Sequence, residues 1–136
     1  MKAYAALCYI RFVTENNVYC ILLCAKSKVA PLKKLTVPRL ELLSCLLLSK
    51  LMMSVKNGIS NILNVKDIFY WNDSEISLCR IRNLNKELKT WEQNRVNLIR
   101  NYSDYEKWNY VATSVNPADL PTRGNDIKSL PKNNHY

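Results

Sequence analysis

The chain has 136 residues, 48% of them hydrophobic, which is enough for one domain with a buried core. It carries 20 Lys and Arg against 11 Asp and Glu, so its formal charge is +9, which favours an anionic partner, most simply nucleic acid. The only histidine, His135, is the penultimate residue. This argues against hydrolases that depend on a Ser/His or Cys/His pair.

The cysteines are odd in number and show no CxxC spacing. The five cysteines are Cys8, Cys20, Cys24, Cys45 and Cys79, and most of them lie within apolar runs. We therefore expect reduced thiols of an intracellular protein, and neither a disulfide framework nor a zinc site. The N-terminus lacks the small-residue cleavage site of a signal peptide.

The first elements in chain order are two β-favouring runs, Ala3–Val13 and Val18–Lys26, separated by "TENN", which predict a hairpin. The segment "KSKVAPLKKLTVPR" follows and contains no acidic residue. Its basic residues are Lys26, Lys28, Lys33, Lys34 and Arg39. Two interpretations stay open, a solvated loop and a surface that contacts phosphates.

A helix over about 38–56 is predicted next, with Thr36 at the N-cap, Pro38 in the first turn and Gly58 as the C-terminal stop. It is apolar on nearly every face, so we expect it to be covered on several sides. A membrane span is disfavoured because lipid would surround three charged residues, Arg39, Glu41 and Lys50.

The remaining elements are shorter. The patterns predict a strand at 65–71, helices at 74–82 and about 89–100, a strand at 107–113, a short final helix opened by "NPAD" with Asn116 as N-cap, and a polar tail from Asn125. The order β, β, α, β, α, α, β, α predicts a mixed α/β fold.

Three acids stand out, and each has a structural alternative. Asp73 follows the third predicted strand and could cap the next helix. Glu41 lies near the start of the apolar helix and could favour the helix dipole. Asp119, in the last helix, could reach back to its cap. Together, carboxylates from a strand end and two helices could bind Mg²⁺ for phosphodiester hydrolysis without histidine.

Several strings, in this order and at these distances, resemble the ribonuclease H-like segment of BEL/Pao retrotransposon polyproteins. They are "AYAALCYIRF", "AKSKVAPLKKLTVPRLELLSCLLLSKL", "FYWNDSEISLCRIR", "WEQNRVNLI" and "WNYVATSVNPADLPTRG". The resemblance covers about Ala3 to Gly124 and implies an RNase H-like domain over 1–124, with one mixed sheet and flanking helices, followed by the tail 125–136. The setting it implies is the cytoplasm or virus-like particles. Such sequences are often labelled as a Pao retrotransposon peptidase, a name that belongs to the neighbouring aspartic protease.

The resemblance implies a two-ion Mg²⁺ site with Glu41, Asp73 and Asp119 as ligands, which would cut the RNA strand of an RNA/DNA hybrid. The basic residues of the "KSKVAPLKKLTVPR" segment would hold the nucleic-acid backbones. The partners it implies are the hybrid and neighbouring polyprotein domains, reverse transcriptase and integrase, with no membrane.

One departure from the family pattern concerns its first strand. Family members carry a further aspartate on a central strand, in a "DAS" string just before the "AY.A" stretch, whereas Met1 and Lys2 precede Ala3 here. We therefore expect a domain that lacks its N-terminal strand, an incomplete metal site, unpaired strand edges and little or no nuclease activity by the chain alone.

Two other function classes stay open. The first is a nucleic-acid-binding module without catalysis, which would show salt-dependent binding and no cleavage. The second is an aspartic peptidase, suggested only by the family label. "WNDSEIS" is not an Asp-Thr/Ser-Gly loop, and no second copy of such a loop is present.

Overall fold

A computed structural model describes residues 3–30 and 35–115 of the chain. Its regular elements in this part are β1 Ala3–Val13, β2 Val18–Val29, α1 Val37–Ile59, β3 Tyr70–Asn72, α2 Glu75–Arg82, α3 Thr90–Tyr102, the 3₁₀ turn η1 Tyr105–Lys107, β4 Trp108–Tyr110 and the 3₁₀ turn η2 Thr113–Val115. The predicted mixed α/β class is confirmed, but the described strands form two small sheets and not the one mixed sheet that the resemblance implies. The predicted final helix and the polar tail lie outside the described residues.

β1 and β2 form the predicted antiparallel hairpin, which turns where the Thr14 N–H donates to the Asn17 carbonyl at 2.8 Å. β2 runs on to Val29, so Lys26 and Lys28 lie in a strand. The loop interpretation is therefore wrong for these two lysines, because their backbone pairs with β1.

α1 starts as predicted, with Thr36 at the N-cap and Pro38 in the first turn, although the Thr36 side chain makes no capping hydrogen bond. The predicted stop at Gly58 is wrong. The helix runs through Gly58 to Ile59, and the backbone N–H of Ser60 donates to the Lys56 carbonyl. Gly58 does not take the left-handed conformation that a C-terminal glycine supplies, so it does not end the helix.

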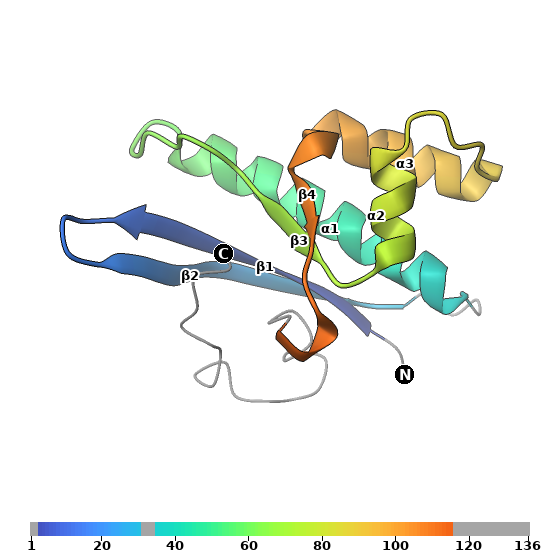
Figure 1. The fold of residues 1–136 in the computed structure, drawn as a ribbon, viewed down its shortest axis with the longest axis horizontal. Coiled ribbons are helices and arrows are strands. Elements are labelled where there is room, and N and C mark those ends of the chain that lie inside the picture. Colours follow the sequence, from blue (N-terminus) through green and yellow to red (C-terminus); the bar gives the residue numbers. More distant parts are fainter. Residues whose placement is uncertain (1–2, 31–34, 116–136) are drawn as a thin grey trace.

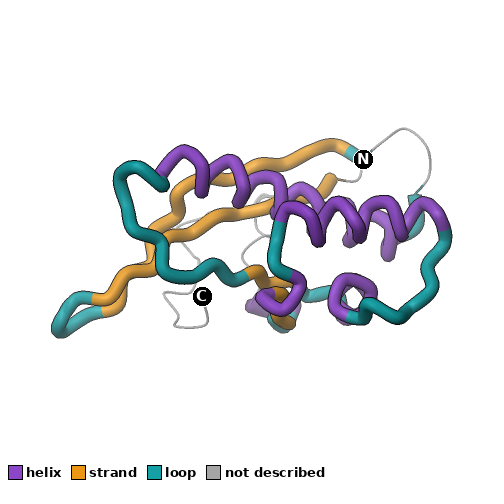
Figure 2. The backbone as a smooth tube through the Cα atoms, turned by 90° about the horizontal axis from the view of Figure 1, so that it is seen from above, coloured by secondary structure: helices purple, strands orange, loops and turns teal. Residues whose placement is uncertain are grey.

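α1 lies at the centre of the fold. It packs against β1 on one side and against α3 and α2 on others, as Figures 1 and 2 show. Most of its residues are buried or half-buried, which confirms that it is covered on several sides. Among the described helices, α1 is the one whose length and apolar composition would suffice to cross a membrane. Its contacts are those of a core helix.

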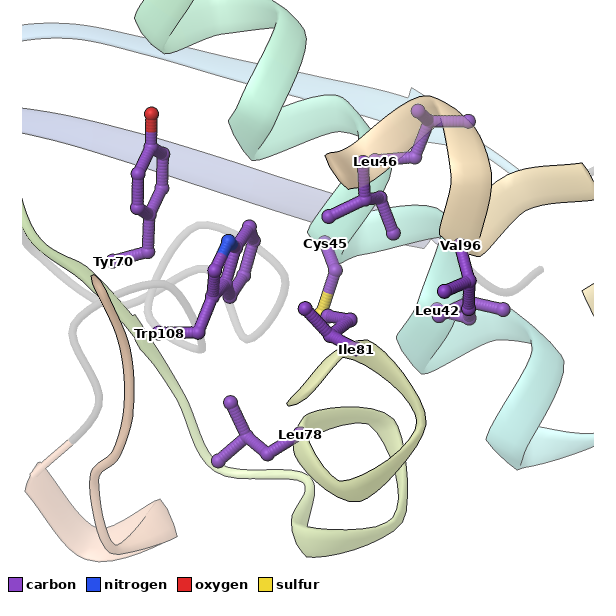
Figure 3. Packing of buried hydrophobic residues seen from close by; sticks show 9 residues of the cluster. Leu42, Cys45, Leu46, Tyr70, Leu78, Ile81, Val96 and Trp108 are labelled. Carbon is purple, nitrogen blue, oxygen red and sulfur yellow. The ribbon is translucent and has the colours of Figure 1, made fainter. Parts of the chain in front are cut away.

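The main core lies between α1, α2, α3 and the short strands (Figure 3). Its centre is Trp108, which is fully buried and stacks on Tyr70 with ring centroids 4.7 Å apart. The Trp108 Nε1–H donates to the Ser103 hydroxyl at 2.9 Å, so the polar edge of the indole is also satisfied. The buried cluster is Leu42, Cys45, Leu46, Tyr70, Leu78, Ile81, Val96, Ile99 and Trp108.

The strands form two separate sheets. β1 pairs with β2, and β3 pairs in parallel with β4 through Tyr70 and Trp108. The predicted strands at 65–71 and 107–113 are too long, because only three residues of each segment pair. In the part of the chain that the structure describes, each strand pairs with a single neighbour, which agrees with the expectation of unpaired edges.

Candidate functional site

Asp73 lies between the end of β3 and the start of α2. The residue that caps α2 is Ser74, whose Oγ accepts from the Ser77 N–H at 3.1 Å. The Ser74 N–H in turn donates to Asn72 Oδ1 at 2.7 Å, which closes a tight turn around the aspartate. Asp73 itself is half-buried. The alternative in which Asp73 caps the helix is therefore wrong, since the cap position is occupied by its neighbour.

Glu41 reaches this turn from α1. The Ser74 hydroxyl donates to Glu41 Oε2 at 2.5 Å, the length of a strong bond to a charged acceptor. Glu41 is half-buried and lies beyond the first turn of α1, which contains no acidic residue. The helix-dipole alternative is weakened accordingly, because the dipole effect falls off within the first turn.

The buried thiol of Cys45 is influenced by both carboxylates. Burial raises the pKa of Cys45 far above its ordinary value, and the negative charges of Glu41 and Asp73 raise it further. Both carboxylates therefore lie within electrostatic reach of one side chain, and that thiol stays protonated and uncharged. Glu41 contacts Ser74, the residue next to Asp73, and the role of both acids as metal ligands stays a prediction.

The donor set fits Mg²⁺ in kind but is small. Mg²⁺ is usually bound by one or two carboxylates, with waters and substrate phosphates filling the other positions. Over residues 3–30 and 35–115 no group of three or more His, Cys, Asp and Glu side chains forms a metal cluster. Asp119, the third predicted ligand, lies outside the described residues. Glu41 and Asp73 are thus a pair of hard oxygen donors held at the end of β3.

The predicted nucleic-acid-binding residues separate into three groups. Lys26 and Lys28 are exposed on β2, whereas Lys33 and Lys34 lie outside the described residues. Arg39 is engaged within the fold, because its Nε donates to Glu92 Oε1 at 2.7 Å. Its contribution to a phosphate-binding surface therefore competes with a structural role.

Arg39 also belongs to an aromatic contact. Its guanidinium lies 4.8 Å from the centroid of the Trp91 ring, and that of Arg95 lies 4.2 Å from the same ring. Cation–π contacts of this kind favour a fixed position for both arginines. Trp91 is half-buried and in contact with these side chains, which agrees with a role in packing.

The sequence-based reasoning missed Ser74. The signal was present in "NDSEIS", because a serine directly before a helical pattern is the preferred N-cap. Ser74 is the residue that joins the end of β3, the start of α2 and Glu41 of α1.

A family model described as the Pao retrotransposon-like RNaseH-like domain matches residues 1–74, which is 74 of 136 residues and more than half of the chain. The chain belongs to this family. The Pao-type match ends at Ser74, so it includes Glu41 and Asp73 and the turn that holds them. RNase H-like domains of this kind typically depend on Mg²⁺. No curated protein and no solved structure gives a significant match.

Replacing Ser74 by alanine tests the turn. We expect Ser74→Ala to lower the free energy of unfolding by about 1 kcal/mol, because the N-cap bond to Ser77 is lost. Urea denaturation followed by circular dichroism measures it. Ser54→Ala, at an exposed position of α1, is the matched control and should change little. Equal stability of Ser74→Ala and the unchanged chain would contradict the assigned cap.

Proposed function

We propose that this domain acts on RNA/DNA hybrids, in a Mg²⁺-dependent site that cuts the RNA strand. Membership of the Pao retrotransposon RNaseH-like family supports a nucleic-acid context. The observation that carries the proposal is the hydrogen bond of Glu41 with Ser74, which places Glu41 beside the turn at the end of β3 that contains Asp73. The exposed Lys26 and Lys28 and the overall charge of +9 favour a polyanionic substrate.

Glu41, Asp73 and Asp119 would hold the metal in this proposal. When bound, Mg²⁺ supplies activation of the attacking water and stabilisation of the leaving oxygen. Ser74 positions Glu41 by donating to its Oε2, the way hydrogen bonds to metal-binding carboxylates orient them. Cys45, kept neutral by burial and by both carboxylates, adds no competing charge beneath them.

We further propose that this chain by itself cuts a hybrid little or not at all. The resemblance assigns one more aspartate to the metal site, and no residue of this sequence matches it. Metal binding is therefore a better readout of the site than turnover. Partners in the polyprotein would be reverse transcriptase and integrase domains, and the setting would be intracellular.

Paramagnetic broadening by Mn²⁺, used in place of Mg²⁺, tests the metal site. We expect Mn²⁺ to broaden the backbone amide signals of Asn72, Asp73 and Ser74 and of the residues next to Glu41. Asp73→Asn or Glu41→Gln should weaken Mn²⁺ binding by about tenfold or more, because each removes a charged oxygen ligand. The measurement is a titration by two-dimensional NMR.

Glu75→Gln is the matched control, since Glu75 is an exposed carboxylate two residues from Asp73. It should leave the titration unchanged. Broadening centred elsewhere, or equal effects of Asp73→Asn and Glu75→Gln, would overturn the assignment. Hydrolysis of a hybrid in Mg²⁺ that Asp73→Asn abolishes would instead show that the chain alone is a complete nuclease.

Substrate binding is tested separately with Lys26 and Lys28, since a binding module without catalysis is the second candidate function. We expect Lys26→Gln/Lys28→Gln to weaken binding of an RNA/DNA hybrid and to reduce the slope of log K against log salt by up to about 2, one contact for each lysine. Fluorescence anisotropy over a range of salt concentrations measures the slope.

Lys50→Gln/Lys56→Gln on α1 is the matched control, because both lysines are exposed and each double variant lowers the formal charge from +9 to +7. If the two double variants weaken binding equally, only net charge matters, and β2 is not the nucleic-acid surface. Binding that depends on Lys26 and Lys28 without any bound metal would favour the binding module.

A further inference from the structure

Cys8 and Cys24 face each other across the hairpin. They are direct partners in the antiparallel register of β1 and β2. Opposite residues of an antiparallel pair have Cα atoms about 4.5–5.5 Å apart and side chains on one face of the sheet. This separation lies within the range of about 4.4–6.8 Å that a disulfide requires.

The two thiols are neighbours on this face. Burial raises the pKa of Cys8 to about 11, and the charge and hydrogen bond of the neighbouring Cys24 thiol raise it as well. Cys8 Sγ also lies 4.0 Å from the sulfur of Met52 on α1. The pair therefore sits on the face of the hairpin that packs against α1.

The ladder is irregular beside this pair. The register shifts between Cys8 and Tyr9, because Leu22 pairs with Tyr9 and Leu23 is left as an extra residue. Such a bulge interrupts the ladder and increases the local twist. The backbone next to Cys24 is therefore less constrained than in a regular ladder, which helps the two sulfur atoms to adopt the geometry of a bond.

We propose that Cys8 and Cys24 form a reversible disulfide across the hairpin when the chain meets a small-molecule disulfide such as oxidised glutathione. Cys24 is partly exposed and Cys8 is buried, so Cys24 reacts first. Its thiolate attacks one glutathione sulfur, the glutathione disulfide bond breaks, and one glutathione thiolate leaves.

The second step closes the bond within the protein. Cys8 gives up its proton to the solvent and its sulfur attacks the Cys24 sulfur, which releases the second glutathione thiolate. Two protein thiols are thereby oxidised, and one glutathione disulfide is reduced to two glutathione thiols. The Cys8 step is the slower one, because its thiol is buried.

The other cysteines serve as internal controls. Cys20 pairs with Arg11, three residues from Cys8, so it lies on the opposite face of the hairpin. Cys45 is fully buried in the core, and Cys79 is exposed on α2. Within the described residues, Cys24 is the cysteine that stands opposite Cys8.

Mass spectrometry of the purified full chain in a glutathione redox buffer tests the proposal. Remaining thiols are blocked with N-ethylmaleimide, and trypsin cleaves after Arg11 and Lys26 without reduction. This places Cys8 in one peptide and both Cys20 and Cys24 in the next. Cys20→Ser removes the ambiguity, so the linked peptides 3–11 and 12–26 identify the Cys8–Cys24 bond.

We expect the linked peptides in the unchanged chain and in Cys20→Ser, their loss in Cys24→Ser, and their release by dithiothreitol. Cys79→Ser should behave like the unchanged chain. The proposal is overturned if Cys24→Ser still yields linked Cys8, or if Cys24 carries glutathione in Cys20→Ser while Cys8 is recovered only as the blocked thiol. Since Cys20→Ser alone decides the pairing, misfolding of Cys24→Ser would not rescue the proposal.

Discussion

Replacing Trp108 by alanine is expected to lower the free energy of unfolding by about 3–5 kcal/mol, the largest effect of any single change proposed for this protein. Trp108 is fully buried, stacks on Tyr70 and anchors the parallel pairing of β3 with β4. Its removal leaves a large cavity and takes one of two hydrogen bonds from the Ser103 hydroxyl, which still donates to the Ile99 carbonyl. A total stability of about 5–15 kcal/mol is typical of domains, so this loss is a large fraction of the free energy that keeps the domain folded.

The control for Trp108 lies in the same strand. Tyr110→Ala also removes an aromatic ring from β4, but Tyr110 is 49% exposed, so its loss should change the stability by only about 0.5 kcal/mol. Urea denaturation monitored by circular dichroism compares the two. Equal losses would mean that β4 contributes through strand pairing and not through the buried indole.

Breaking the ion pair between Arg39 and Glu92 is expected to cost about 3 kcal/mol, because it leaves a carboxylate buried without its partner. Glu92 is 6% exposed, and its second oxygen, Oε2, has no hydrogen-bond partner among the described residues. Arg39→Met keeps the length of the side chain and removes its charge. Loss of one partner of a buried ion pair usually costs about 3–5 kcal/mol, and we expect the low end because the Arg39 side chain is one-third exposed.

A double variant separates charge from packing. Arg39→Met/Glu92→Leu should recover most of the loss, because an apolar pair of similar volume replaces the ionic one. If the double variant is as unstable as Arg39→Met alone, the contact of Arg39 with Trp91 is the dominant interaction. Thermal and urea unfolding of the unchanged chain, both single variants and the double variant complete the cycle.

The same pair makes stability depend on pH. Burial opposes ionisation of Glu92, but the hydrogen bond and charge of Arg39, with the charge of Arg80, more than offset it and hold the pKa of Glu92 below its ordinary value. Ionised Glu92 therefore adds to the free energy of unfolding above pH 4.3 or so, about the pKa of a glutamate in the unfolded chain. This stabilisation is lost as the pH falls through the lower pKa of Glu92 in the folded protein. Arg39→Met should remove this acid dependence.

The hairpin and α1 could be predicted because local patterns dominate them. Alternating and β-branched residues mark Ala3–Val13, and a long apolar run behind Pro38 marks α1. The short strands could not be delimited. Residues 65–69 are β-favouring in composition, yet only Tyr70, Trp71 and Asn72 find a partner strand, and pairing depends on the distant residues Trp108, Asn109 and Tyr110.

In the candidate site, too, local features could be predicted and long-range contacts could not. The types and positions of Glu41 and Asp73 suggested that they would meet, and the structure places Glu41 in contact with Ser74, the neighbour of Asp73. The hydrogen bond from Ser74 to Glu41 joins residues 33 apart in the sequence, so no local pattern could indicate it. The engagement of Arg39 with Glu92 spans 53 residues and was equally hidden. Asp119 stays a prediction.

The separation of the strands into two sheets has a consequence for how the molecule opens. The hairpin shares no ladder hydrogen bonds with β3 or β4, and the packing of β1 on α1 is its main attachment. We therefore expect the hairpin to open as a unit while the cluster around Trp108 stays closed. The rate at which the hairpin opens is then expected to depend on how well β1 packs against α1.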